Sequence, residues 1–129
     1  MGNAKLFGEW MKYAQADYTA AVHLTSHYPI QLEIVCFHCQ QAGEKALKAI
    51  LAFHDEPIPR THNLYELLQL CEVHYPAIVD ALVNQADQLT NYAVVARYPN
   101  DEMTVTEQDM KIALTCAEKV LSYVKNLRA

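Results

Sequence analysis

Apolar residues recur at steps of three and four positions along most of this chain, with polar residues between them, which is the spacing of one side of a helix. Strand-like alternation is absent, and so are Gly-containing hairpin turns. We therefore predict an all-α fold with four long helices and one short one, over segments 4–26, 31–54, a short run after Asn63, 76–96 and a last run ending at Leu127. Connections of a few residues favour antiparallel neighbours, so we expect an up-and-down bundle with the short helix in the link between helices two and four.

The segment 31–54 carries a wide apolar stripe, and we predict that it is the central helix. Small residues run along this stripe, among them Cys39, Gly43 and Ala46, which favours close packing on more than one side. A second side of the same helix carries Phe37, Gln41, Glu44 and Lys48, with Gln40 and Lys45 beside them. The central helix is therefore also a candidate for a subunit interface.

Prolines and capping residues set the predicted helix limits. Tyr28-Pro29 ends the first helix, because proline disfavours helical backbone in the residue before it. Asn63 with Glu66 three residues later is a capping-box pattern that starts the short helix, and Pro76 suits the first turn of the next one. The last helix has two candidate caps, namely Thr104 with Glu107 and Thr106 with Asp109.

Asp17 lies within the apolar series of the first helix, four residues after Tyr13 and three before Ala20. Its carboxylate is therefore directed toward the core, where it requires a partner to remain charged. Lys45 and Arg60 are the candidate partners. A buried structural ion pair is favoured over a catalytic carboxylate, since a perturbed environment marks functional sites only statistically.

Composition limits the classes of protein to consider. The chain has 129 residues, of which 52% are apolar and 3 are Gly, which predicts one domain over residues 1–129 without flexible linkers. Its formal net charge is -5, with 10 Lys plus Arg against 15 Asp plus Glu. Binding of duplex nucleic acid by bulk electrostatics requires a basic face, which this balance does not supply overall. A local basic site on a dimer is compatible with it.

The four cysteines fall at apolar positions of the predicted helices, and nothing at the N-terminus resembles a secretory signal, so we expect reduced thiols in the cytoplasm. No apolar run reaches the roughly 18 residues of a membrane span, so no membrane association is expected. Cys36 and Cys39 are spaced like a zinc-ligand or redox pair, with His54 and His62 later, but a structural zinc site normally shows two tight pairs. We therefore predict core thiols, with neither a metal nor a cofactor. Gly-rich phosphate loops and Ser-His-Asp or HExxH arrangements are also missing.

Arg97 is the strongest candidate for a binding residue. It is expected at the end of a helix, next to Tyr98 and a proline-enforced turn, with Tyr92 about one turn earlier. A planar guanidinium in such a place suits a phosphate or carboxylate held by two hydrogen bonds. The alternative is a salt bridge to Asp101 or Glu102, and the residues favour neither.

Arg60 and His62 form a second polar cluster, directly before the predicted short helix. The free N–H groups at a helix N-terminus favour an anion. Helix capping and anchoring of the loop remain the preferred roles for these two residues.

Three sequence segments together resemble the HEPN domain, and the resemblance covers nearly the whole chain. They are FHCQQAGEKALK at 37–48, PRTHNL at 59–64 and ARYP at 96–99. The resemblance implies four long helices with a short extra one, commonly in a homodimer. It also implies one of two functions. In one branch of the family, the protein accompanies a separate minimal nucleotidyltransferase, like the substrate-binding helical domain of larger nucleotidyltransferases. In the other it is a metal-independent ribonuclease, often the toxin of a toxin-antitoxin pair.

The chain departs from the ribonuclease branch at one position. That branch has an Arg, four to six arbitrary residues and then a His at the end of a helix, with two copies meeting across the dimer. Arg97 matches the Arg, but Asp-Glu-Met-Thr at 101–104 fills the places of the His. RNA cleavage by the 2'-hydroxyl requires a proton carrier near neutral pH, for which histidine is best suited. The Tyr that follows this His in some members, and receives a nucleotide, is not matched either.

We therefore favour an accessory role, in which a homodimer binds a nucleotide or substrate and partners a nucleotidyltransferase. Arg97 would hold a phosphate, with rim residues Tyr92, Tyr98, His38, Gln41, Lys45, Arg60 and His62. The alternative is a ribonuclease that uses Arg97 with a histidine brought to it by the fold, His38 or His62, or with an acidic residue. A dimeric interaction module without a ligand is the third hypothesis.

Overall fold

Five α-helices make up the part of the chain that the computed structural model describes, residues 2–93 and 104–127. They are α1 (Ala4–Leu24), α2 (Leu32–Phe53), α3 (Leu64–Glu72), α4 (Ile78–Thr90) and α5 (Glu107–Leu127). Within these two ranges no residue is in a strand, so the predicted all-α fold is confirmed. None of the described helices has the length and apolarity needed to cross a membrane.

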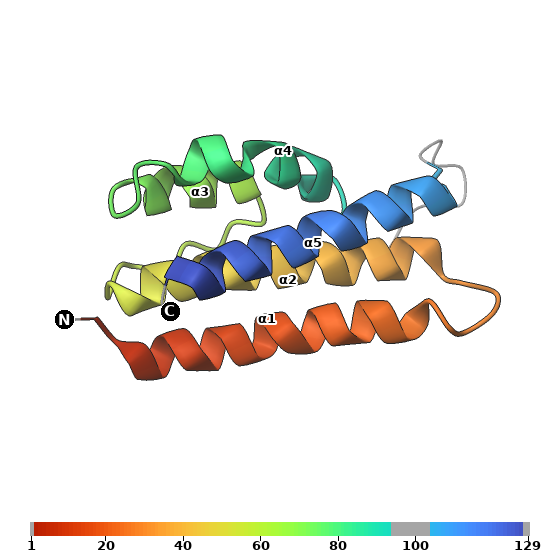
Figure 1. Cartoon of the computed structure of the whole chain (residues 1–129), viewed down its shortest axis with the longest axis horizontal. Coiled ribbons are helices and arrows are strands. Elements are labelled where there is room, and N and C mark those ends of the chain that lie inside the picture. Colours follow the sequence, from red (N-terminus) through yellow and green to blue (C-terminus); the bar gives the residue numbers. More distant parts are fainter. Residues whose placement is uncertain (1, 94–103, 128–129) are drawn as a thin grey trace.

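Helices α1, α2, α4 and α5 alternate in direction, as predicted for an up-and-down bundle. Figure 1 shows α1 and α4 running one way along the long axis and α2 and α5 running the other way, with α3 in the link between α2 and α4. Helix α2 packs against each of the other four helices, whereas α1 packs against α2 and α5. The prediction that segment 31–54 forms the central helix is therefore confirmed.

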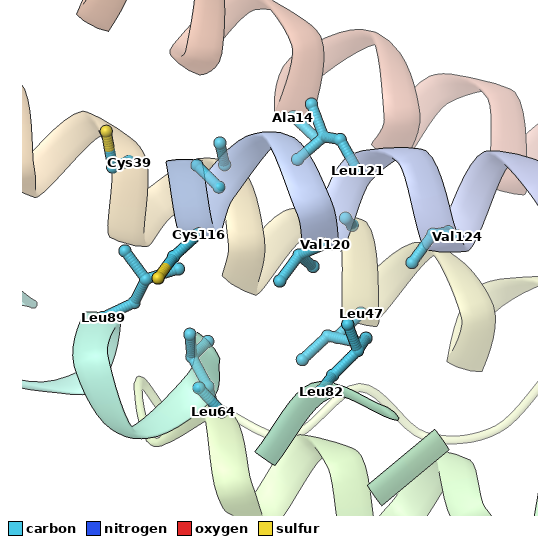
Figure 2. Packing of buried hydrophobic residues seen from close by; sticks show 14 of the residues in the cluster. Ala14, Cys39, Leu47, Leu64, Leu82, Leu89, Cys116, Val120, Leu121 and Val124 are labelled. Atoms are coloured by element: carbon cyan, nitrogen blue, oxygen red, sulfur yellow. The ribbon is translucent and has the colours of Figure 1, made fainter. Parts of the chain in front are cut away.

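Small residues let the neighbouring helices approach α2 closely. At Gly43 an added Cβ would lie 3.2 Å from Cδ1 of Leu89 and 3.5 Å from Cδ1 of Leu64, so a larger side chain would crowd α3 and α4. Figure 2 shows Leu89 of α4 directed toward Cys116 of α5. All four cysteines are buried and free, as expected for core thiols.

Helices α3 and α5 begin at two of the predicted caps. The side chain of Asn63 accepts a hydrogen bond from the N–H of Glu66 at 3.2 Å. Thr106 and Asp109 bond reciprocally, each backbone N–H donating to the other side chain at 3.0 Å. Of the two candidate caps for the last helix, Thr106 with Asp109 is therefore the one that forms.

Three helix limits differ from the predictions. Helix α1 ends at Leu24, earlier than expected, because the hydroxyl groups of Thr25 and Ser26 donate to the carbonyls of the last turn. Helix α4 begins at Ile78, since Pro76 belongs to a turn before it. Within the described residues α4 ends at Thr90, so Ala93 lies beyond it. The hydroxyl of Thr90 donates to the Ala86 carbonyl and accepts the N–H of Leu64, which ties this end to α3.

Candidate functional site

Asp17 of α1 lies between two basic side chains of α2. Its Oδ1 is 2.9 Å from Nδ1 of His38, and its Oδ2 is 2.5 Å from Nζ of Lys45. The three side chains are partly buried, with 14%, 28% and 29% of their surface exposed for Asp17, His38 and Lys45. The predicted pairing of Asp17 with Lys45 is therefore confirmed, and His38 is a second partner that the sequence did not suggest.

The spacing of His38 and Lys45 explains this cluster. Seven residues are two helical turns, so both side chains lie on the side of α2 that packs against α1. Each oxygen of the Asp17 carboxylate serves one of them. A phosphate approaching Lys45 would have to compete with this internal anion.

A second cluster lies on another side of α2, around Glu44. Glu44 and Lys48 are 4% and 8% exposed, and Gln40 is fully buried. Oε2 of Glu44 is 2.9 Å from Nζ of Lys48, while its Oε1 accepts from Nε2 of Gln40 at 3.1 Å. Nδ1 of His62 lies 2.8 Å from the same Oε1. The cluster therefore joins α2 to the linker that precedes α3.

These contacts keep Glu44 ionised. Burial alone would raise the pKa of its carboxyl group, but hydrogen bonds from Lys48, His62 and Gln40, with the charge of Lys48, outweigh burial and lower the pKa. Gln40 adds a second bond to the linker, because its Nε2 also donates to the His62 carbonyl at 3.0 Å. His62 is thus anchored through both its ring and its backbone.

Gln40 has one atom without a partner. Its Oε1 is buried and accepts no hydrogen bond from the residues that the structure describes. Buried acceptors are normally satisfied by protein or water.

The predicted rim residues occupy several positions around α2. His38 and Lys45 lie with Asp17, and His62 lies with Glu44. Gln41 is half-buried, and Arg60 is exposed without an ion pair to another described residue. Arg97 and Tyr98 lie outside the described residues, so their place in a common site stays a prediction.

Tyr92 follows the end of α4 and is half-buried. Burial, followed by the nearby acidic groups of Cys36 and Asp109, raises the pKa of its phenol. Tyr92 packs against the apolar core, whereas His38 contacts Asp17 of α1.

The Glu44 cluster as a whole was not predicted from the sequence. The four-residue steps from Gln40 to Glu44 and to Lys48 were visible, and Glu before Lys at this spacing is a favourable helical pair. The contact of His62 with Glu44 could not be predicted, because it depends on the path of the linker. Within the described ranges, no three His, Cys, Asp or Glu side chains are arranged to hold a metal ion.

This chain is similar in sequence and structure to known proteins. Residues 7–127 match the family model for the HEPN domain. The crystal structure of ST0689, an archaeal HEPN homologue, is similar with a TM-score of 0.73 and 29% identity, covering 94% of this chain and 96% of that one. The crystal structure of TT1696 from Thermus thermophilus is similar with a TM-score of 0.72 and 27% identity, covering 93% of this chain and 96% of that one. Among curated proteins, no sequence matches.

Proposed function

This chain belongs to the HEPN domain family, and we propose that it is an accessory protein that binds a nucleotide for a separate nucleotidyltransferase. The observation that carries the proposal is the sequence after Arg97, where Asp-Glu-Met-Thr at 101–104 replaces the histidine of the ribonuclease pattern. Arg97 can bind a phosphate without that histidine, whereas cleavage requires a proton carrier. The homodimer is part of the proposal.

The contacts of the other candidate histidines support this choice. His62 is bonded to the buried Glu44, and His38 is bonded to Asp17 on another side of α2. In these positions each ring joins two elements of the bundle. Structural contacts therefore account for both histidines without a role in cleavage.

The charge of the chain supports a compact anion as the ligand. A net charge of -5 opposes a long polyanion, because affinity for nucleic acid grows with the number of phosphates that cations neutralise. A nucleotide needs only one or two cations. Arg97 and the exposed Arg60 are the cations we assign to it, while Lys45 is already paired with Asp17.

Binding of a fluorescent ATP analogue to the purified chain tests this proposal. We expect saturable binding that weakens about tenfold or more in Arg97→Ala, since a bidentate contact to phosphate is lost. Lys12→Ala, at an exposed position of α1, is the matched control and should bind as the wild type does. Absence of binding, together with no nucleotidyltransferase recovered from the native cell, would contradict the proposal and leave an interaction module without a ligand.

The Asp17–His38 pair favours one second candidate, a ribonuclease. A carboxylate bonded to Nδ1 fixes the orientation of an imidazole and leaves Nε2 for proton transfer. RNA cleavage in the presence of a chelator tests this function. Activity lost in both Arg97→Ala and His38→Ala would establish it, and no cleavage by the wild type would exclude it.

A further inference from the structure

A groove of about 330 Å³ lies between α3 and the linker that follows α2. Leu51 of α2 lines it, with Leu70 and Val73 on the α3 side. The linker side is formed by Glu56, Pro57, Ile58 and Pro59. Most of the lining is therefore apolar, and none of these residues belongs to the Asp17 or Glu44 cluster.

Two large apolar side chains stand exposed beside this groove. Leu70 is 45% exposed and Val73 is 78% exposed, and they lie three residues apart on α3 and its C-cap. Single exposed apolar residues are ordinary on protein surfaces, but a contiguous set around a hollow is typical of a binding site. The described chain therefore leaves an apolar surface uncovered at this end of the molecule.

The linker that forms one wall of the groove is held in place by its prolines and by hydrogen bonds. Prolines at 57 and 59 restrict the linker backbone. The N–H of Glu56 donates to the Leu51 carbonyl at 2.9 Å, and Oε1 of Glu56 is 3.1 Å from Nε2 of His74. At the other end of the linker, the hydroxyl of Thr61 donates to Oε2 of Glu66 at 2.7 Å. Little ordering is required on binding, which favours affinity.

One carboxylate, that of Glu56, lines the groove, and a second, that of Glu66, lies on α3 one turn before Leu70. Glu66, Leu70 and Val73 follow one another at four and three residues, so they share one side of α3. Glu66 lies in the first turn of α3, and Glu56 lies beside His74, which follows the C-cap of α3. Both carboxylates are on exposed residues. Arg60 is the one basic residue of the linker segment 55–61.

We propose that this groove docks a segment of a partner protein in which large apolar side chains are flanked by Lys or Arg. The apolar residues would cover Leu70 and Val73, and the flanking cations would meet Glu56 and Glu66. A second copy that places the same groove against this one is a poor occupant, because it presents the same carboxylates. The inference does not depend on the proposed nucleotide binding, and the two can fail separately.

Selection from a displayed peptide library against the full chain tests the groove. We expect enriched peptides to carry an apolar centre with basic flanks, and Val73→Glu to weaken their binding about tenfold or more. Glu56→Gln with Glu66→Gln keeps one acceptor oxygen on each side chain but removes the charges, so binding should fall several-fold and lose most of its salt dependence. Val22→Glu on α1, 44% exposed in the wild type, is the control and should leave binding unchanged.

Three results would overturn the proposal. Peptides that bind Val73→Glu as well as the wild type would place their site elsewhere. Enrichment of acidic or uncharged flanks, or of no peptide at all, would remove the assigned occupant. Sedimentation showing that Val73→Glu, but not Val22→Glu, dissociates a dimer would identify a second copy as the occupant, with circular dichroism establishing that both variants are folded.

Discussion

Glu44 and Lys48 form an ion pair one turn apart on α2, with 2.9 Å between Oε2 and Nζ, although the residues are only 4% and 8% exposed. Removing two charges from water is costly, so such a pair persists only where the remaining hydrogen-bonding positions are also satisfied. His62 and Gln40 satisfy Oε1 of Glu44. The ion pair therefore depends on the linker being in place against α2.

Replacing Glu44 by Gln should destabilise the fold by about 3 kcal/mol or more, because the Lys48 ammonium would remain buried without its counter-charge. Urea unfolding of the wild type and Glu44→Gln measures this loss as a lower transition midpoint. The double variant Glu44→Leu with Lys48→Met is the matched comparison, and it should lose less than Glu44→Gln alone. Equal stability of Glu44→Gln and the wild type would mean that the pair does not form.

The Glu44 carboxylate should also make the stability of the fold depend on pH. The pKa of Glu44 in the folded chain lies below its ordinary value of 4.5, so the unfolded chain binds the proton more readily. Its contribution is complete above the unfolded value and is lost as the pH falls through the folded pKa. The free energy of unfolding, measured from pH 7 to pH 3, should therefore fall more below about pH 4.5 for the wild type than for Glu44→Gln. Parallel curves for the two proteins would contradict this assignment.

Asp17→Asn should lower stability by about 1 to 2 kcal/mol, since hydrogen bonds to charged groups contribute about this much when partly buried. The substitution keeps the shape of the side chain but removes the charge that His38 and Lys45 share. Thermal or urea unfolding is the measurement. Asp87→Asn, at an exposed position of α4, is the control and should change stability by less than about 0.5 kcal/mol. Similar losses of stability in Asp17→Asn and Asp87→Asn would show that the loss comes from removing a negative charge anywhere on the chain and not from the contacts of Asp17.

Periodicity predicted the features that depend on one helix or on neighbouring residues. The stripe on α2 was sufficient to identify the central helix, and short-range patterns identified the caps at Asn63 and Thr106. The position of Asp17 within an apolar series was sufficient to predict that it has a basic partner, and of the two candidates, Lys45 and Arg60, the structure shows Lys45. These inferences need only the geometry of a helix and the cost of burying a charge.

Features that depend on the path of an irregular segment were not predictable. The bond between His62 and Glu44 requires the linker to pass beside α2, which no periodic pattern encodes. The groove beside Val73 likewise exists because the linker and α3 lie next to each other. At the ends of α1 and α4, single hydroxyl groups such as that of Thr90 donate to backbone carbonyls. Such a hydroxyl can bond to several nearby backbone groups, so the sequence does not show which bond forms.

The four cysteines should resist alkylation as long as the chain is folded. Burial raises the pKa of both Cys36 and Cys71 to about 12, and it also raises the pKa values of Cys39 and Cys116. At pH 8 a thiol with a pKa of 12 is ionised to about one part in ten thousand, and the thiolate is the reactive form. Mass spectrometry after iodoacetamide treatment should therefore find little modification in buffer and four modified cysteines in urea. Cys116, the most exposed of the four at 7%, should react first as denaturant is added. Rapid modification of Cys36 or Cys39 in buffer would contradict their place in the core and reopen a reactive role for this pair.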